Sequence, residues 1–420
     1  MSSETTSPAT SAPPADDNRW RDAAREILAG RPAVAVGALI LALIAGSVMI
    51  AFTNSDVREA SGWFFARPGD TLTALGRAMG GAYGQLIRGS IWNWQATSFT
   101  AQIRPLMNTF DNATPLIAAG LGVAVTFRAG LFNIGGRGQM LAAAIAAGWV
   151  GFGIPGIPFP LHLILCIIAG ALAGALWGGI AGFLKAKTGA HEVIATIMLN
   201  YVGYYLLQYL LATPGLLQAP GSPNPITPAT PESAQLPALF GRQFTVDWGF
   251  PLALLAVVFC WWLLNRSSLG FTFRAVGENP RAARVAGIDV ARATTIVFMV
   301  GGALMGLAGA QQVLGTVTTG FTDGIDGGIG FDAITVALLG GSQPVGVLFA
   351  GLLFGAFKAG GSAMQAGQGI PVEIVSVIQS LIVLFIAAPP LVRAIFRLPQ
   401  PSQLAAARKA GKAARKETDK

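Results

Sequence analysis

The chain has 420 residues, of which 53% are hydrophobic and 11% are charged, and its mean hydropathy is +0.57. This balance excludes an ordinary soluble domain and predicts an all-α, polytopic membrane protein. The net charge of +8 does not indicate a partner nucleic acid, because the basic residues gather at the ends of apolar runs and in the C-terminal tail rather than among stacking aromatic residues.

The N-terminus combines a polar tail with a first membrane span. Residues 1–31 are rich in Ser, Thr, Pro and Ala, which predicts a disordered cytoplasmic tail. An apolar run begins near Ala33 and is long enough to cross a bilayer, so the start does not have the layout of a cleaved signal peptide. Arginines precede this run, which places the N-terminus on the inside by the positive-inside rule.

Further apolar stretches predict a transmembrane domain over residues 32–396 with about ten helices. Several stretches are too short to span unaided, so we expect some helices to be tilted, extended or broken. An even number of crossings returns the basic tail, residues 397–420, to the cytoplasm. The stretches are Thr114–Phe127, Gln139–Gly153, Leu161–Leu184, Val193–Leu211, Phe250–Leu264, Thr295–Thr316, Phe331–Gly340, Val345–Met364 and Val372–Phe396.

Two polar segments are assigned to the outer face. The Pro-rich segment 213–249 has Arg242 as its one basic residue, as expected of an external loop. The segment Thr53–Arg104 follows the first span and is placed outside as well, although it carries five arginines. Acids at membrane depth are expected at Glu192, Asp332 and Glu373.

A glycine-rich break, "GLFNIGGRGQM" over Gly130–Met140, interrupts two apolar stretches. Polar groups within membrane spans tend to face a pathway, and amides supply both the donors and the acceptors that a neutral ribose or base needs. The alternative for each amide is a hydrogen bond between helices. Arg137 is expected as an anchor on the cytoplasmic side. The predicted pathway residues are Phe132, Asn133, Gln139, Asn200, Gln311, Gln312 and Asp332.

The stretch Leu269–Thr295 has a helix signature in a polar, basic context. Asn279 can cap a helix, Pro280 suits its first position, and Gly287 ends it, so one or two turns are expected over Arg281–Ala286. Either this short helix contacts a partner, or the stretch is a basic loop that only fixes the topology.

Other features have simpler interpretations. "GGALMGLAG", Gly301–Gly309, predicts close helix packing. The two histidines and two cysteines show no metal-ligand spacing, so no metal site is expected. Asp323 and Asp326 lie in a Gly-rich loop that is expected on the outer face, where they either contact an external binding protein or form a turn.

Four motifs in this order resemble one family: "FRAGLFNIGGRGQM", "HEVIATIMLNYV", "FRAVGENPRAARVAGI" and "GFDAITVALLGGSQPVG". They are similar to the permease subunits of bacterial ABC importers for nucleosides and simple sugars, within the wider branched-chain amino acid and ribose permease group. They extend over Phe127–Gly346, most of the membrane domain. "GGRGQ" stands where many members carry "GAEGQ", so Arg137 replaces an acid.

The resemblance implies a type II ABC importer permease in the bacterial inner membrane, with a partner ATP-binding subunit, a second permease subunit and an external substrate-binding protein. The segment resembling Val276–Gly287 would dock on the ATPase as a coupling helix. The chain has no G-x-x-x-x-G-K-[ST] phosphate loop, so we expect no enzyme activity and no cofactor of its own, with ATP used by the partner. The coupling residues are Arg274, Gly277, Glu278, Asn279, Arg281, Ala282, Ala283, Arg284 and Gly287.

The forms "GLFNIG" and "HEVIATIMLNY" look closest to nucleoside permeases, which often pair two different permease chains. A nucleoside importer built on a heterodimer is therefore favoured over a homodimer. Import of a simple sugar such as ribose is the alternative. An alternative of another class is a stand-alone secondary transporter or channel, for which inverted repeats and a buried ion site would be expected.

Overall fold

The computed structural model describes residues 31–241 and 243–398, and the regular elements in these residues are helices, with one isolated bridge between Ala238 and Asp247. The predicted all-α fold is confirmed. The predicted N-terminal tail before Arg31 and the C-terminal tail after Leu398 lie outside the described residues.

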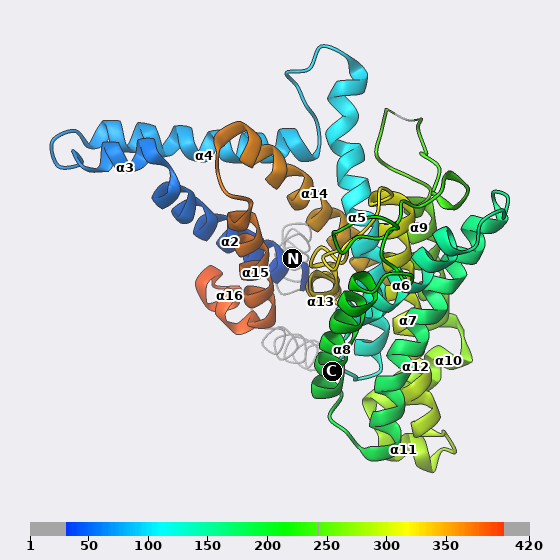
Figure 1. Ribbon diagram of the computed structural model, residues 1–420. Coiled ribbons are helices and arrows are strands. Elements are labelled where there is room, and N and C mark those ends of the chain that lie inside the picture. Colours follow the sequence, from blue (N-terminus) through cyan, green and yellow to red (C-terminus); the bar gives the residue numbers. More distant parts are fainter. Residues whose placement is uncertain (1–30, 242, 399–420) are drawn as a thin grey trace, which may run out of the picture. The chain divides into compact units, whose positions relative to one another are not determined.

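Seventeen elements follow one another along the described chain (Figure 1). They are α2 (Arg31–Thr53), α3 (Ser55–Ser61), α4 (Pro68–Ser90), α5 (Phe99–Arg128), α6 (Gly136–Gly153), α7 (Leu161–Thr188), α8 (Glu192–Ala212), η1 (Glu232–Ala234), α9 (Gly249–Arg266), α10 (Ser268–Glu278), α11 (Pro280–Val285), α12 (Val290–Gln311), η2 (Gln312–Thr316), α13 (Ile329–Leu339), α14 (Pro344–Gln368), α15 (Val372–Ala387) and α16 (Pro389–Phe396).

Each predicted apolar stretch is helical. Seven helices in the described part are long and apolar enough to cross a membrane, namely α2, α5, α7, α8, α9, α12 with η2, and α14. The pair α15 and α16 adds an eighth span if the two are counted together, although they meet at 92°. The remaining predicted stretches form α6, whose first turn carries Arg137 and Gln139, and α13, which has 11 residues. The expectation of short or broken helices is thus confirmed.

The described chain divides into two compact units, and the smaller comprises residues 31–45 and 381–398. Its core joins Val34 and Ala38 of α2 to Val392 of α16. The break before α16 follows from Pro389 and Pro390, because proline has no backbone N–H to continue the preceding helix and disfavours helical geometry in the residue before it.

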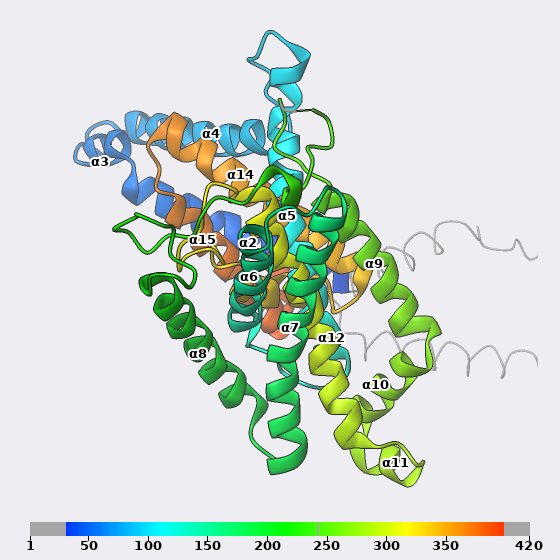
Figure 2. The same cartoon turned by 45° about the vertical axis from the view of Figure 1, so that its right-hand side comes forward.

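The larger unit, residues 46–380, is organised around α5. This helix of 30 residues is buried along its second half, where it packs against α9, α12, α13 and α14 (Figures 1 and 2). The core there consists of residues such as Leu116, Leu121 and Phe298. Helix α5 begins at Phe99, well before the predicted start at Thr114, so Asp111 lies within the helix.

Glycines allow α7 and α12 to pack backbone against backbone. A Cβ atom on Gly174 would collide with the carbonyl oxygen of Gly302, and one on Gly302 would collide with that of Gly174. One turn further along, a Cβ atom on Gly306 would lie 2.5 Å from the carbonyl oxygen of Gly170. Small residues at helical spacing permit this approach, so the close packing predicted for Gly301–Gly309 is confirmed.

The segment Thr53–Arg104, for which the sequence predicted no helices, contains α3, α4 and the start of α5. Helix α4 packs on α14 along a second row of small residues, with Gly89 against Ala363 and Gly360 against Leu86. The Pro-rich segment 213–249 has little helix, and its backbone bonds to the Gly-rich loop. For example, the Thr227 amide donates to the carbonyl oxygen of Phe321 at 3.1 Å.

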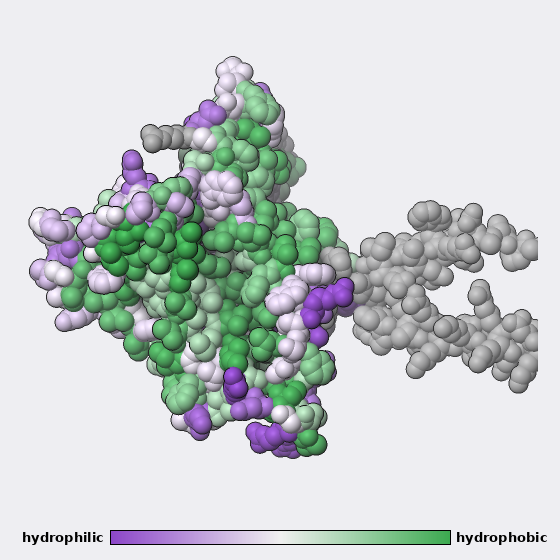
Figure 3. All heavy atoms as spheres, turned by 90° about the vertical axis from the view of Figure 1, so that its right-hand side faces the viewer, coloured by the Kyte–Doolittle hydropathy of each residue, from purple (hydrophilic) through white to green (hydrophobic). Residues whose placement is uncertain are grey.

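The space-filling view shows a broad apolar surface that gives way to hydrophilic residues at the end where α10 and α11 lie (Figures 2 and 3). Side chains exposed on this unit include Leu172, Leu176 and Leu255. Such a large apolar surface on one molecule is typical of contact with lipid or with another membrane subunit.

Candidate functional site

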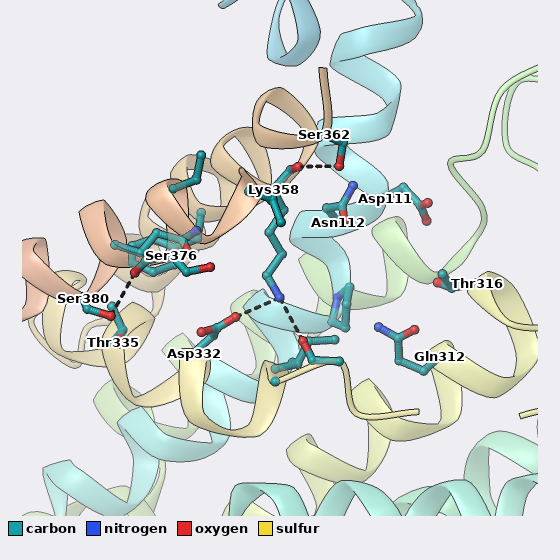
Figure 4. Close-up of a pocket in the computed structure, with 18 residues that line it drawn as sticks. Asp111, Asn112, Gln312, Thr316, Asp332, Thr335, Lys358, Ser362, Ser376 and Ser380 are labelled. Atoms are coloured by element: carbon teal, nitrogen blue, oxygen red, sulfur yellow. Dashed lines mark hydrogen bonds and ion pairs between the residues drawn. The ribbon is translucent and has the colours of Figure 1, made fainter. Parts of the chain in front are cut away.

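A cavity of about 540 Å³ lies between α5, α13, α14, α15 and the segment that leads from η2 to α13 (Figure 4). This volume is within the range of small-molecule sites. One part of its wall is apolar, formed by Pro115, Ile329, Phe354, Val372 and Val375. The polar part comprises Asp111, Asn112, Gln312, Thr316, Asp332, Thr335, Lys358, Ser362, Ser376, Gln379 and Ser380.

An ion pair crosses the cavity wall between α13 and α14 (Figure 4). Lys358 Nζ lies 2.8 Å from Asp332 Oδ2, and it also donates to the carbonyl oxygen of Gly327 at 3.3 Å. The two side chains are 25% and 28% exposed, so both still face the open space of the cavity. The lysine therefore holds the Gly-rich loop and α13 together while its charge stays balanced.

Several hydrogen-bond donors of the wall are already satisfied within the protein. Ser362 Oγ donates to the carbonyl oxygen of Lys358 at 3.2 Å, and Ser380 Oγ donates to that of Ser376 at 2.9 Å. Asn112 Nδ2 donates to the carbonyl oxygen of Asn108 at 2.8 Å. The wall thus offers these groups chiefly as acceptors to a bound molecule.

The structure does not bring the seven predicted pathway residues together. Gln312 and Asp332 line the cavity. Phe132 does not: its side chain is 55% exposed, and its ring lies 4.9 Å from that of Phe127. Gln311 is buried beside the cavity wall, where its Nε2 lies 3.5 Å from Asp247 Oδ2 and 3.2 Å from Thr316 Oγ1. Asp247 lies outside the helices, and burial raises the pKa of its carboxyl to about 6.

The other three predicted residues form a buried amide cluster around the break. Asn133 and Gln139 exchange two side-chain hydrogen bonds of 3.2 Å, and Asn133 Oδ1 also accepts from the Gly135 amide at 2.9 Å. Asn200 of α8 accepts from the Gly138 amide at 2.8 Å and donates to the carbonyl oxygen of Ile134 at 2.9 Å. These side chains bond backbone groups that the interrupted helix leaves without partners.

We predict that Asn200→Leu destabilises the protein by about 2–4 kcal/mol, because it leaves the Gly138 amide and the Ile134 carbonyl without their partner. Thermal unfolding in detergent measures the effect. Asn265→Leu is the matched control, because Asn265 is exposed and bonds only to Trp261 of its own helix, so its change should stay within about 0.5 kcal/mol. Equal unfolding temperatures for the two variants would contradict the prediction.

Arg137 has its partners in the loop that the sequence assigned to the outer face. Its Nε lies 3.2 Å from Asp326 Oδ1, and its guanidinium lies 4.7 Å from the centre of the Tyr204 ring. A cytoplasmic Arg137 and an external Asp326 cannot both hold, so at least one of these two expectations is wrong.

Asp326 is 4% exposed, and burial raises its pKa while Arg137 opposes the shift. Hydrogen bonds from Gln208 and Tyr204 lower the pKa of Asp323.

Sequence reasoning found two of the eleven polar residues that line the cavity and missed the others, among them Asp111, Lys358 and Gln379. Asp111 was overlooked because the predicted span began after it, so it was absent from the acids expected at membrane depth. Lys358 lies within the predicted span Val345–Met364, where a lone charge in an apolar run was a usable signal. Gln379 sits in α15 with the same signal as the amides that were chosen.

The stretch predicted to couple to a partner has the expected local structure. Asn279 caps α11 by accepting from the amides of Arg281 and Ala282, both at 3.1 Å, and Gly287 ends the turn with a φ of +83°. Ala283 is buried against Val276. Among the predicted coupling residues, Arg274 and Gly277 are half-buried, and the exposed ones are Glu278, Asn279, Arg281, Ala282, Arg284 and Gly287. Val285 of α11 is exposed as well. The preceding helix α10 was not predicted.

Glycines join this stretch to the break and the break to the cavity. A Cβ atom on Gly277 would lie 2.7 Å from the carbonyl carbon of Ala129, and one on Gly130 would lie 3.0 Å from the carbonyl oxygen of Gly277. At the other end of the break, a Cβ atom on Gly330 would lie 2.5 Å from the amide nitrogen of Arg137. Asp332 follows Gly330 by one turn or less, so backbone contacts lead from α10 to the ion pair.

Comparison with known proteins gives one consistent result. The family described as the permease component of branched-chain amino acid transport systems matches residues 106–387. The guanosine ABC transporter permease protein NupP of Bacillus subtilis is 40% identical over 303 residues, 71% of this chain and 84% of the relative. The nucleoside ABC transporter permease protein NupB of Lactococcus lactis is 35% identical over 71% of this chain and 83% of its own length. The glucose ABC transporter permease protein TsgB13 of Haloferax volcanii is 36% identical over 67% and 75%.

Proposed function

The chain belongs to the family of branched-chain amino acid transport system permease components, and from this membership we propose that it forms the translocation pathway of an ATP-driven nucleoside importer. The chain is a transport permease and not an enzyme. The guanosine and nucleoside permeases among its relatives support a nucleoside as cargo. The glucose permease of H. volcanii supports the alternative of a simple sugar. Family membership favours the importer subunit over the stand-alone transporter or channel.

Apart from the similarity to nucleoside permeases, the observation that supports a nucleoside cargo is that the cavity wall has an apolar part and a polar part. A nucleoside has a flat, largely apolar base and a ribose with several hydroxyl groups. Phe354, Val372 and Val375 suit the base, while Asp332, Thr335 and Gln312 offer hydrogen bonds to hydroxyl groups. A simple sugar has no part that requires such an extended apolar wall.

The predicted pathway residues then take two roles. Gln312 and Asp332 contact the cargo as it passes through the cavity. The conformation of the break is stabilised by Asn133, Gln139 and Asn200. Gln311 stabilises η2 through its side-chain contacts with Asp247 and Thr316. Phe132 lies on the surface of the break, available to lipid or to another subunit.

The importer needs three further proteins: an ATP-binding subunit, a second permease chain that makes a heterodimer, and an external substrate-binding protein. ATP acts through the first of these. The exposed, basic and apolar surface of α11, with Arg281, Arg284 and Val285, suits a groove on the ATP-binding subunit. Val285 is 90% exposed, which supports contact with a partner rather than a role within this chain.

The chain is a multi-pass membrane protein, and we assign it to the bacterial inner membrane with α11 and both termini in the cytoplasm. Lys185 and Lys187 end α7 near α11, since Lys185 and Arg284 line one smaller cavity. Basic residues gathered there are expected on the inside. We propose the same domain limits as the sequence predicts: a membrane domain over 32–396, a coupling segment over 269–295, an external loop over 213–249 and two tails.

Movement of α11 on the ATP-binding subunit reaches the cavity through the glycine contacts. Because Gly277 packs closely on Ala129, a shift of α10 displaces the break. Because Gly330 packs closely on Arg137, a shift of the break displaces the start of α13. Packed backbones transmit displacement well because they leave little room to slide. ATP turnover thereby alters the position of Asp332.

Uptake in cells that carry the complete set of transporter genes tests this function. Removing the gene for this chain should abolish uptake of labelled guanosine, and restoring the full chain should recover it, in both cases only while cellular ATP is maintained. Unchanged nucleoside uptake with loss of ribose or glucose uptake would establish the sugar alternative. Transport down an ion gradient by the reconstituted chain alone, with no ATP-binding subunit present, would overturn the importer assignment.

A further inference from the structure

One amide group in the cavity wall has a donor without a partner. Gln379 of α15 is 7% exposed, and its Nε2 has no hydrogen-bond partner among the described residues. Elsewhere among the described residues, three other side chains also have a buried polar atom without a partner, namely Gln85, Trp177 and Gln311. None of those three lines the cavity, whereas Gln379 does.

A buried amide N–H without an acceptor is unfavourable, so native proteins keep one mainly where water or a ligand completes it. At Gln379 the open side is the cavity itself. Two nearby donors of the wall have acceptors within the protein, since Ser380 Oγ bonds to Ser376 and Lys358 Nζ bonds to Asp332 and Gly327. An acceptor on a molecule in the cavity is therefore the partner that Gln379 Nε2 lacks.

The position of Gln379 within the wall indicates which part of a nucleoside supplies that acceptor. Gln379 lies four residues after Val375 and seven after Val372 on α15, so the three share one face of the helix, and all three line the cavity. The charged pair Asp332 and Lys358 belongs to α13 and α14 (Figure 4). A base resting on the valines presents its ring nitrogens or carbonyl oxygens at its edge, within reach of the amide.

We propose that Gln379 is a specificity-determining residue that donates a hydrogen bond from Nε2 to an acceptor on the edge of the nucleobase. The inference rests on the proposed nucleoside transport and adds the residue that recognises the base. Sites that hydrogen-bond a polar group of the ligand reject analogues that lack this group, because the buried protein group is then unpaired. Gln379 accordingly favours nucleosides over free sugars and over bases without that acceptor.

The test measures guanosine uptake by the complete transporter carrying Gln379→Leu or Gln379→Glu. Leucine has no polar group, and an ionised glutamate keeps the shape but cannot donate. Each variant should raise the KM for guanosine on the order of tenfold with little change in maximal rate, because one net hydrogen bond is lost. The parent should also discriminate against at least one of 3-deazaguanosine, 7-deazaguanosine and 2-aminopurine riboside, and both variants should lose this discrimination.

Gln85→Leu is the matched control. Gln85 also has a buried amide atom without a partner, yet it lies on α4 and does not line the cavity, so its KM and analogue preference should equal those of the parent. An unchanged KM and unchanged preference in Gln379→Leu, with guanosine uptake by the parent intact, would overturn the role of Gln379 alone. Absence of guanosine uptake by the parent would instead refute the proposed function.

Discussion

Asp332→Asn is expected to reduce ATP-driven uptake on the order of a hundredfold, with a smaller fall in stability. The substitution removes the carboxylate 2.8 Å from Lys358 Nζ and leaves a lysine cation unpaired in a membrane protein. Removing one member of a pair whose side chains are 25% and 28% exposed costs more than the pair contributes, because the remaining charge is uncompensated. The Gly327 carbonyl, 3.3 Å from Lys358 Nζ, then remains as the acceptor of the lysine but cannot neutralise its charge. Initial uptake rates at matched protein amounts measure the effect.

A double-mutant cycle separates the pair from its individual members. Asp332→Asn combined with Lys358→Met removes both charges, so the double variant should be more stable in detergent than Asp332→Asn alone. Its uptake should stay low, because Asp332 also accepts hydrogen bonds from the cargo in the proposed function. Glu373→Gln is the control for charge, since Glu373 is exposed on α15 and does not line the cavity. Additive effects in the cycle would show that the two side chains act independently.

Gly277→Pro is expected to abolish ATP-coupled uptake, a loss on the order of a hundredfold or more, while the chain still inserts into the membrane. Gly277 lies in the last turn of α10, where proline removes a backbone N–H and clashes with the preceding turn. Any side chain there also pushes against Ala129, because a Cβ atom would lie 2.7 Å from its carbonyl carbon. Uptake and ATP hydrolysis by the assembled transporter, measured side by side, report whether the two activities are uncoupled.

Removing positive charge from α11 tests whether this helix binds the ATP-binding subunit. The double variant Arg281→Ala and Arg284→Ala removes two exposed cations without altering the Asn279 cap, and it should lower uptake and the amount of ATP-binding subunit that co-purifies. Arg292→Ala is the control, because Arg292 is exposed on the next helix outside α11. Normal uptake and normal co-purification in the double variant would exclude α11 as the docking element.

Local signals in the sequence were strong enough to place the apolar helices and the capped turn of α11. Asn279, Pro280 and Gly287 act through bonds and dihedral angles within a few residues, and the structure has them in those roles. The short α13 follows from its local apolar length. The break before α16 was not predicted, since Val372–Phe396 was expected as one stretch, although Pro389 and Pro390 were a local signal for it. The helices α3, α4 and α10 escaped prediction, because their polar residues resemble those of loops unless the packing partner is known.

The sequence by itself thus determined the all-α membrane class, the family, the position of the break at Gly130–Met140 and the capped turn of α11. Only the tertiary structure decided which polar residues face the cavity. Asn133 and Asp332 were both predicted to line the pathway, yet Asn133 bonds the backbone of the break and Asp332 lines open space beside Lys358. The physical reason is that a buried polar group needs a partner, and whether this partner is a backbone amide or a passing molecule depends on helices far apart in the chain.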